Sequence, residues 1–264
     1  TCALPILMKA GIFQLGRLVS LRRIAPAHSG MAMADDGTVS LGGMATLTAL
    51  ARSPIVQEQL PLVADCLPAL SNVRVRNVAT LGGHLAHADP HTDLPPVLIA
   101  LGAHVVAAGP NGERRIPVED LAVGYYATAL AGNELITDVR VPPQGARRGA
   151  YLKWTARSAD DWPTVGVAII LSVTEGDQIS DARVVVSAAT DRPTRLTAAE
   201  AELRGQRVTD DLLRRASEAA REQVDAVEDT RGSADYKREL VRISVTRGVR
   251  RRLNGGPQIG RAHV

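Results

Sequence analysis

Apolar and polar positions in the first part of the chain predict short strands and short helices. Two apolar runs between Met31 and Met44 flank Asp36-Gly37, a dipeptide typical of a β-hairpin turn. Thr46 and Ser53 each precede an apolar stretch, where their side chains can cap a helix. Pro54 then occupies the first helical position, which favours proline. We therefore expect a hairpin followed by two helices.

The pattern stays mixed up to Val141. The run LPPVLIAL, from Leu94 to Leu101, predicts a helix. Strands are expected at His104–Ala108 and at Arg114–Ile116, on either side of a Gly-Pro-Asn-Gly turn. Glu134–Val141 alternates between apolar and polar residues, as a half-buried strand does.

The segment PPQGARR, from Pro142 to Arg148, is the clearest linker, and the pattern changes after it. Antiparallel strands followed by helices predict a layered α+β domain. We expect an α+β chain with domains at 7–143 and 149–254. The predicted elements of the second domain are strands at 151–156, 165–173 and 179–188, and helices at 198–203, 211–224 and 235–253, with Thr197 and Ser233 as caps of the first and last helices.

The two ends of the chain are related through their DNA. One strand that encodes Ile-Gly-Arg-Ala-His-Val has a reverse complement that encodes Thr-Cys-Ala-Leu-Pro-Ile, and these are the last and first six residues. Unrelated termini are not expected to share one sequence in this way. We interpret 1–6 and 259–264 as adaptor-like ends and expect the natural chain to be truncated at both sides.

Composition excludes several classes of protein. The net charge of +3 is too small for a dedicated nucleic-acid surface. Cys2 belongs to an adaptor-like end, which leaves Cys66 alone, so an internal disulfide and a cysteine-ligated iron–sulfur cluster are excluded. No apolar run is long enough to span a membrane.

The stretch TLGGHLAHADPHTD, from Thr80 to Asp93, holds the candidate chemistry. Adjacent glycines such as Gly82 and Gly83 allow a ligand to approach the backbone closely, and successive N–H groups in such a loop can bind phosphate. An ordinary turn explains the glycine pair equally well. Asp93, just before an apolar helix, can cap that helix or bind a sugar hydroxyl.

A second interpretation of the same stretch uses its histidines. His84, His87 and His91, with two nearby aspartates, resemble a ligand set for zinc or iron. The glycine and proline residues prevent one regular helix from presenting all three imidazoles. A metal site is the weaker hypothesis.

A longer pattern is more specific. RNVATLGGHLAHADP, from Arg76 to Pro90, followed by Asp93-Leu94-Pro95, resembles the second flavin-binding loop of the FAD subunits of molybdenum hydroxylases. These are the medium subunits of the carbon monoxide dehydrogenase and xanthine dehydrogenase family. YLKWTARSADDWPTVGVA and RGSADYKRELVRISVTRGVRR resemble the C-terminal domain of the same subunits. The resemblance covers nearly all of Leu7 to Leu253.

The resemblance implies a fold and a set of cofactor contacts. Residues 7–143 would form the second part of a PCMH-type FAD-binding domain, without its N-terminal phosphate loop, and 149–254 the flavoprotein C-terminal domain. FAD would lie between the domains. The implied contacts are the backbone and hydroxyl around Thr80, Leu81, Gly82, Gly83 and His84 for the pyrophosphate, Asp93 for the ribose, and Ile136 and Lys153 for the isoalloxazine ring.

Two of these contacts have alternative explanations. Ile136 is equally well explained as an ordinary core residue, and Lys153 as a lysine at a strand edge that faces solvent. A cation near the ring would stabilise its anionic reduced form. No catalytic residue and no metal ligand is assigned.

The resemblance also implies the activity. The chain would be the FAD-carrying electron-transfer subunit of a cytoplasmic oxidoreductase complex, with an iron–sulfur small subunit and a molybdenum-cofactor large subunit as partners. Electrons would pass to an acceptor such as a quinone or NAD, with no nucleic acid and no membrane span involved. The alternatives are a metal-dependent hydrolase that uses His84, His87 and His91, and a non-catalytic interaction module.

Overall fold

The structure is a computed structural model, and it describes residues 8–11, 16–158, 161–174, 176–253 and 259–263, the last of these and 252–253 by their backbone alone. The adaptor-like residues 1–6 lie outside this range. The opposite end contains strand β12 (Ile259–His263), which pairs in parallel with β8 (Arg148–Thr155). The sequence predicted no element there.

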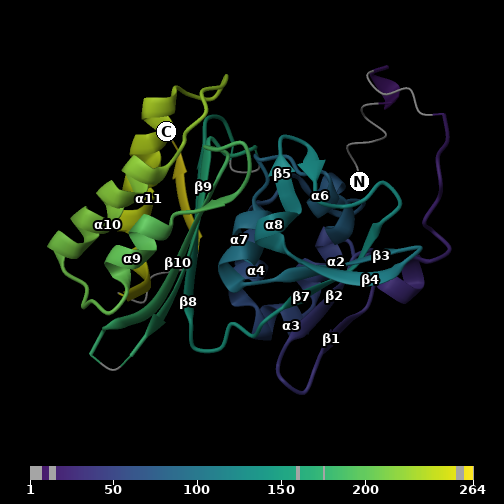
Figure 1. Ribbon diagram of the computed structural model, residues 1–264, viewed down its shortest axis with the longest axis horizontal. Coiled ribbons are helices and arrows are strands. Elements are labelled where there is room, and N and C mark those ends of the chain that lie inside the picture. The colour runs from purple at the N-terminus through teal and green to yellow at the C-terminus, as the bar shows by residue number, and fades with distance from the viewer. Residues whose placement is uncertain (1–7, 12–15, 159–160, 175, 254–258, 264) are drawn as a thin grey trace.

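The first domain is built on a five-stranded antiparallel sheet, in the order β1–β2–β7–β3–β4 (Figure 1). The predicted hairpin at Asp36-Gly37 is confirmed by the pairing of β1 with β2 and by the left-handed φ of 79° at Gly37. The strands are β1 (Met31–Met33), β2 (Val39–Gly42), β3 (His104–Gly109), β4 (Gly112–Pro117) and β7 (Leu135–Val141), with the small hairpin β5 (Ala122–Gly124) and β6 (Ala127–Thr128) beside them.

Short helices connect and cover this sheet. Thr46 and Ser53 are N-caps, as predicted: their hydroxyls accept hydrogen bonds from Ala49 N–H and Val56 N–H. The helices are α2 (Leu47–Arg52), α3 (Pro54–Gln59), α4 (Pro61–Cys66), α5 (Val73–Arg76), α6 (Leu81–Ala86), α7 (Leu94–Leu101) and α8 (Val118–Leu121), with single 3-10 turns η1 (Ala25–His28) and η2 (Leu67–Ala69).

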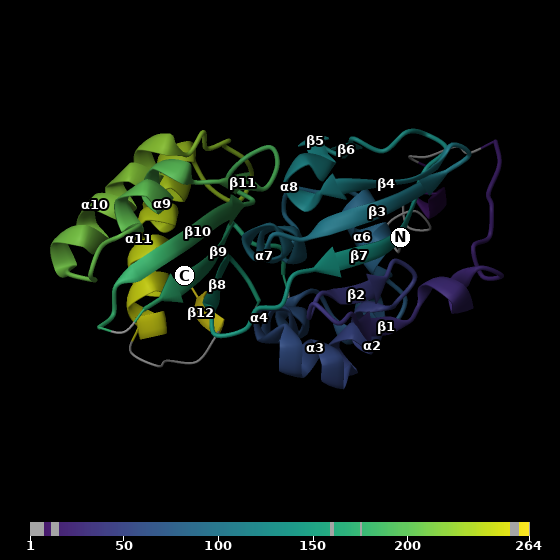
Figure 2. The same ribbon diagram turned by 60° about the horizontal axis from the view of Figure 1, so that its bottom comes forward.

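The second domain has a sheet in the order β11–β10–β9–β8–β12 and three helices on its outer face (Figures 1 and 2). Ser233 caps the last helix as predicted, because Tyr236 N–H donates to its hydroxyl at 3.3 Å. Thr197 does not cap: Leu196 holds the N-cap position and Thr197 lies inside the helix. The remaining elements are β9 (Val165–Val173), β10 (Ile179–Ser187), β11 (Thr194–Arg195), α9 (Thr197–Leu203), α10 (Asp210–Gln223) and α11 (Ala234–Leu253).

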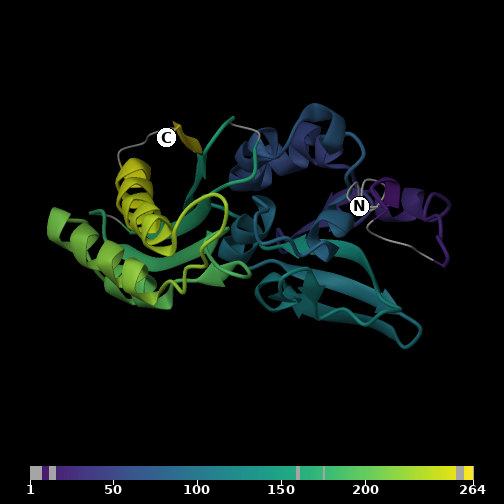
Figure 3. The same cartoon turned by 90° about the horizontal axis from the view of Figure 1, so that it is seen from above.

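Helix α7 lies between the two domains and packs against β9 and β10 (Figures 2 and 3). Successive side chains on a strand point to opposite faces. Ala168 and Ile170 of β9 therefore belong to the core of the first domain, whereas Val167 and Ile169 join the core under the outer helices. The second sheet is covered on both faces, and the two domains share one continuous apolar contact.

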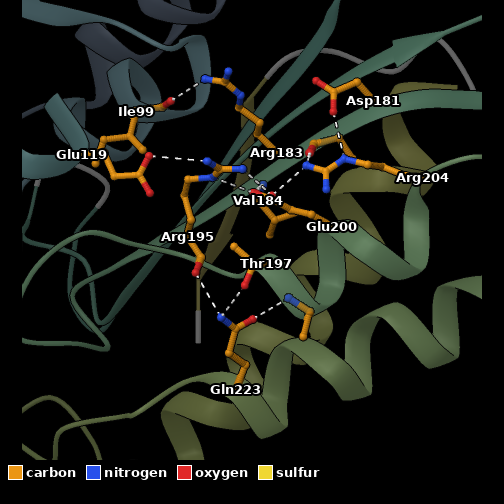
Figure 4. A network of polar contacts seen from close by, with 12 residues as sticks. Ile99, Glu119, Asp181, Arg183, Val184, Arg195, Thr197, Glu200, Arg204 and Gln223 are labelled. Atoms are coloured by element: carbon orange, nitrogen blue, oxygen red, sulfur yellow. Dashed lines mark hydrogen bonds and ion pairs between the residues drawn. The ribbon is translucent and has the colours of Figure 1, made fainter. Parts of the chain in front are cut away.

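Polar contacts also cross this boundary. The carboxylate of Glu200 is fully buried and accepts hydrogen bonds from Val184 N–H, Arg195 and Arg204 (Figure 4). Arg195 also lies 3.5 Å from Glu119 of the first domain. The network thus fixes α9 to β10 and connects the second domain to α8.

No helix within the described ranges is long and apolar enough to cross a membrane.

Candidate functional site

The first domain contains a cavity of about 810 Å³. Its walls come from the N-terminal segment, α5, α6 and β7, and most of the lining side chains are apolar. The described lining residues are Val19, Leu21, Ile24, His28, Gly43, Met44, Arg74, Val75, Val78, Thr80, Gly82, Gly83, Ala86, Leu130, Glu134, Leu135, Ile136 and Thr137. The volume falls within the usual range for small-molecule and cofactor sites.

The TLGG segment forms part of this wall as a helix, which corrects the predicted loop. Thr80 is the N-cap of α6, and its hydroxyl accepts a hydrogen bond from Gly83 N–H at 3.3 Å. The N–H groups of Leu81 and Gly82 donate to the carbonyls of Ala45 and Gly43. These two donors already have partners in the protein, so they are not free for a phosphate.

Glycine is required here by close contact between three segments. A Cβ on Gly43 would lie 2.2 Å from the carbonyl oxygen of Ile136, and one on Gly82 would lie 2.9 Å from the carbonyl oxygen of Gly43. A Cβ on Gly42 would lie 2.2 Å from the carbonyl oxygen of His28. The absence of side chains at Gly43 and Gly82 therefore lets α6, the end of β2 and β7 pack closely together beside the cavity.

Four of the eight residues proposed as cofactor contacts line the cavity: Thr80, Gly82, Gly83 and Ile136. Ile136 is also part of the core, as one explanation predicted, and its contact with the flavin ring stays a prediction. Leu81 and His84 lie on α6 but are not among the lining residues. The cavity is enclosed by residues between 19 and 137, so it lies within the first domain and not between the two domains.

Asp93 and Lys153 lie apart from the cavity, at the boundary between the domains. The Lys153 ammonium is 3.0 Å from Asp93 Oδ2, and the Tyr151 hydroxyl donates to Asp93 Oδ1 at 2.7 Å. Lys153 also donates to the Ala69 carbonyl at 2.9 Å. Lys153 is thus buried and does not face solvent, and Asp93 does not cap α7 through its side chain.

Two of the three histidines of this segment, His87 and His91, contact Asp89, but their contacts are those of ion pairs. His91 lies between two carboxylates: Nδ1 is 3.1 Å from Asp89 and Nε2 is 3.0 Å from Asp229 of the second domain. His84 Nε2 is buried without a hydrogen-bond partner, and burial together with the neighbouring His87 lowers the pKa of His84 to about 4. Across the described parts of the chain, no group of three or more His, Cys, Asp or Glu side chains is arranged to hold a metal ion.

The sequence did not single out two charged residues of the cavity. Glu134 accepts two hydrogen bonds from Arg114, at 2.7 and 2.8 Å, and these bonds lower the pKa of Glu134 to about 2. Arg74, on α5, lines the cavity without a hydrogen bond or ion pair from its side chain to any described residue. Nothing in the spacing of the arginines distinguishes Arg74 from the others; only the three-dimensional structure does.

Comparison with known proteins identifies the family. The protein-family model for the FAD binding domain in molybdopterin dehydrogenase matches residues 2–144 of this sequence. The family model for the CO dehydrogenase flavoprotein C-terminal domain matches residues 150–251. The chain is 33% identical to the carbon monoxide dehydrogenase medium chain of Hydrogenophaga pseudoflava, over 92% of this chain and 84% of that protein. It is 36% identical to the nicotine 6-hydroxylase medium subunit of Paenarthrobacter nicotinovorans, over 80% and 74%.

Solved structures agree with this assignment and with the predicted α+β architecture. Carbon monoxide dehydrogenase from Hydrogenophaga pseudoflava superposes with a TM-score of 0.91 at 35% identity, covering 97% of this chain and 88% of the other. Quinoline 2-oxidoreductase from Pseudomonas putida 86 gives 0.89 at 26% identity, with 96% and 87% covered. The chain belongs to the FAD-binding medium subunits of the molybdenum hydroxylase family of oxidoreductases, of the carbon monoxide dehydrogenase and xanthine dehydrogenase type.

Proposed function

We propose that this chain is the electron-transfer subunit of a cytoplasmic molybdenum-dependent hydroxylase or dehydrogenase. Its partners would be a small subunit with iron–sulfur clusters and a large subunit with the molybdenum cofactor. The chain would pass electrons from the clusters to a quinone or NAD. The substrate would be oxidised on the large subunit, so the medium subunits of carbon monoxide dehydrogenase and nicotine 6-hydroxylase can be similar although their names indicate different substrates.

The observation that supports this proposal is the cavity beside α6. Its volume of about 810 Å³ and its largely apolar walls suit a large planar ring system with a polar tail. Thr80, Gly82, Gly83 and Ile136 line it and are our proposed contacts for FAD. FAD, when bound, supplies a carrier that exchanges electrons singly with clusters and in pairs with an acceptor.

The residues of this chain position and enclose that group. Ile136 and the neighbouring apolar side chains remove water from one side of the cavity. The closely packed glycine backbones form a floor without side chains. The Thr80 hydroxyl already accepts from Gly83 N–H, and it keeps its O–H and one lone pair for the ligand. The proposed roles of Leu81, His84, Asp93 and Lys153 in binding would need contacts other than those in this structure, and for the last two a separation of their ion pair.

A substitution that fills the cavity tests the binding site. Val78 is 65% exposed and lines the cavity, so Val78→Trp should block it without disturbing the core. Val73 is 54% exposed on α5 and is not a lining residue, so Val73→Trp is the matched control. Equilibrium dialysis with FAD in the presence of a chelator should show binding by the wild type and the control and none by Val78→Trp. Equal binding by all three proteins would place FAD elsewhere.

Electron transfer needs a separate measurement. The flavin absorbance of the loaded chain is followed after addition of a pre-reduced iron–sulfur small subunit, and then after addition of a quinone or of NAD. Bleaching followed by recovery with one acceptor is the expected result. No bleaching by the reduced small subunit would contradict the proposed path.

A further inference from the structure

The cavity that we propose for FAD has an uneven distribution of charge. Its described lining contains one basic and one acidic side chain, Arg74 and Glu134, besides His28. The charge of Glu134 is balanced by the guanidinium of Arg114, which donates two hydrogen bonds to it, and Ala131 N–H donates a third. The charge of Arg74 has no such partner among the described residues, so the lining carries one uncompensated positive charge.

Arg76, the other arginine of α5, differs from Arg74 because its side chain has hydrogen-bond partners. The Arg76 guanidinium donates to the carbonyls of Pro68, Leu70 and Ser71 and so holds the preceding turn together. Within the described residues the Arg74 side chain has no such bonds, and its backbone N–H donates to the Asn72 side chain at 3.0 Å. Arg76 therefore stabilises the fold, whereas Arg74 is an exposed residue of the cavity lining whose charge is available to a ligand.

We infer that Arg74 binds the phosphate groups of the ligand in this cavity. The inference rests on the proposed FAD function and adds a residue to it. A diphosphate carries about two negative charges, and a mostly apolar wall is a costly place for an anion without a counter-charge. A guanidinium forms paired hydrogen bonds with phosphate oxygens, which an ammonium cannot match. The backbone donors of Leu81 and Gly82 are already occupied, which leaves a need for a side-chain donor.

The test compares ligands with and without phosphate. FAD, ADP and riboflavin are titrated into the wild type, Arg74→Gln, Arg74→Lys and Arg52→Gln, at ligand concentrations up to the millimolar range and at two salt concentrations. Arg52 is an exposed arginine of the same domain outside the cavity, so Arg52→Gln makes the same charge change elsewhere. Arg74→Gln should weaken FAD and ADP binding about tenfold, with riboflavin unchanged. Arg74→Lys should recover part of the loss.

The outcomes separate this inference from the proposed function. If the wild type binds FAD and Arg74→Gln binds it equally well, Arg74 is not a phosphate contact, and the FAD site stands. If Arg74→Gln weakens riboflavin as much as FAD, Arg74 acts through the shape of the site and the inference is wrong. If the wild type binds no flavin at these concentrations, both proposals fail.

Discussion

The ammonium of Lys153 lies 3.0 Å from the carboxylate of Asp93, and this contact joins the second domain to the first. Both side chains are nearly inaccessible, with 3% and 4% exposed. Burial raises the pKa of Asp93, while Lys153 and the Tyr151 hydroxyl act in the opposite direction. Desolvation offsets most of the attraction in such a pair, so its net contribution to stability is small.

Removal of one partner should therefore cost far more than removal of both. We expect Lys153→Met to lower the free energy of unfolding by about 3–5 kcal/mol, because Asp93 stays buried without its counter-charge. The double variant Lys153→Met with Asp93→Leu should recover most of that loss. Urea unfolding of both variants measures the difference. A double variant as unstable as the single one would show that the pair itself stabilises the domain boundary.

His91 should make stability fall at alkaline pH. Both of its ring nitrogens face carboxylates, which requires both to carry protons. Burial disfavours the charge, but the hydrogen bonds to Asp89 and Asp229 outweigh it and raise the pKa of His91 above its usual value of about 6.5. The stabilisation is complete below about pH 6.5 and is lost as the pH rises through the raised pKa.

Variants of two histidines check this assignment. His91→Gln should lower the free energy of unfolding at pH 6 by about 1–3 kcal/mol and flatten its decline above pH 6.5. His104→Gln is the control, because burial and nearby arginines lower the pKa of His104, which therefore cannot cause an alkaline loss. If the alkaline decline is the same in His91→Gln as in the wild type, another group is responsible.

His84 should make stability fall at acidic pH, opposite to the effect of His91. Its pKa is lowered to about 4 by burial and by the nearby His87. The folded state favours the neutral imidazole of His84. Its contribution to the free energy of unfolding is therefore complete above about pH 6.5 and is lost as the pH falls towards 4. NMR titration of the histidine ring protons, assigned with His84→Asn, should show one imidazole that stays neutral at pH 5. A normal titration of that signal would mean that His84 is more accessible than the structure indicates.

The glycine floor predicts a steric effect on stability. Gly43→Ala would place a Cβ 2.2 Å from the Ile136 carbonyl oxygen, so β2 and β7 must separate. We expect a loss of at least about 2 kcal/mol in the free energy of unfolding. Gly132→Ala is the matched control, because a Cβ there meets nothing within 4 Å. Thermal unfolding of both variants should show a lower Tm only for Gly43→Ala.

Elements with a strong local signal could be predicted from the sequence. Leu94–Leu101 and Val165–Val173 have the bounds expected from their apolar runs, because nearly all of their residues are buried and they need no polar face. The TLGG segment was predicted as a loop because adjacent glycines let a ligand approach the backbone and because the motif resembles a flavin-binding loop. It forms a helix because the absence of a side chain at Gly82 allows close contact with Gly43 and Ile136. Both contacts are distant in sequence, so local sequence does not reveal them.

The candidate site was predictable only in part, for the same reason. The long motif identified the family and the residues Thr80, Gly82 and Gly83, which line the cavity. It did not show that Asp93 would face Lys153, since this contact depends on how the second sheet docks on α7. Nor did it separate Arg74 from Arg76, because only the folded chain brings the carbonyls of Pro68, Leu70 and Ser71 to the Arg76 guanidinium.

The position of α7 has a consequence for folding cooperativity. All residues of α7 except Pro95 are buried, and they contact α4 and α8 of the first domain and β9 and β10 of the second. A cut in the linker at 142–148 would expose this apolar surface on one fragment and the inner face of β9 and β10 on the other. We therefore expect the two regions, which two separate family models match, to unfold together in a single calorimetric transition.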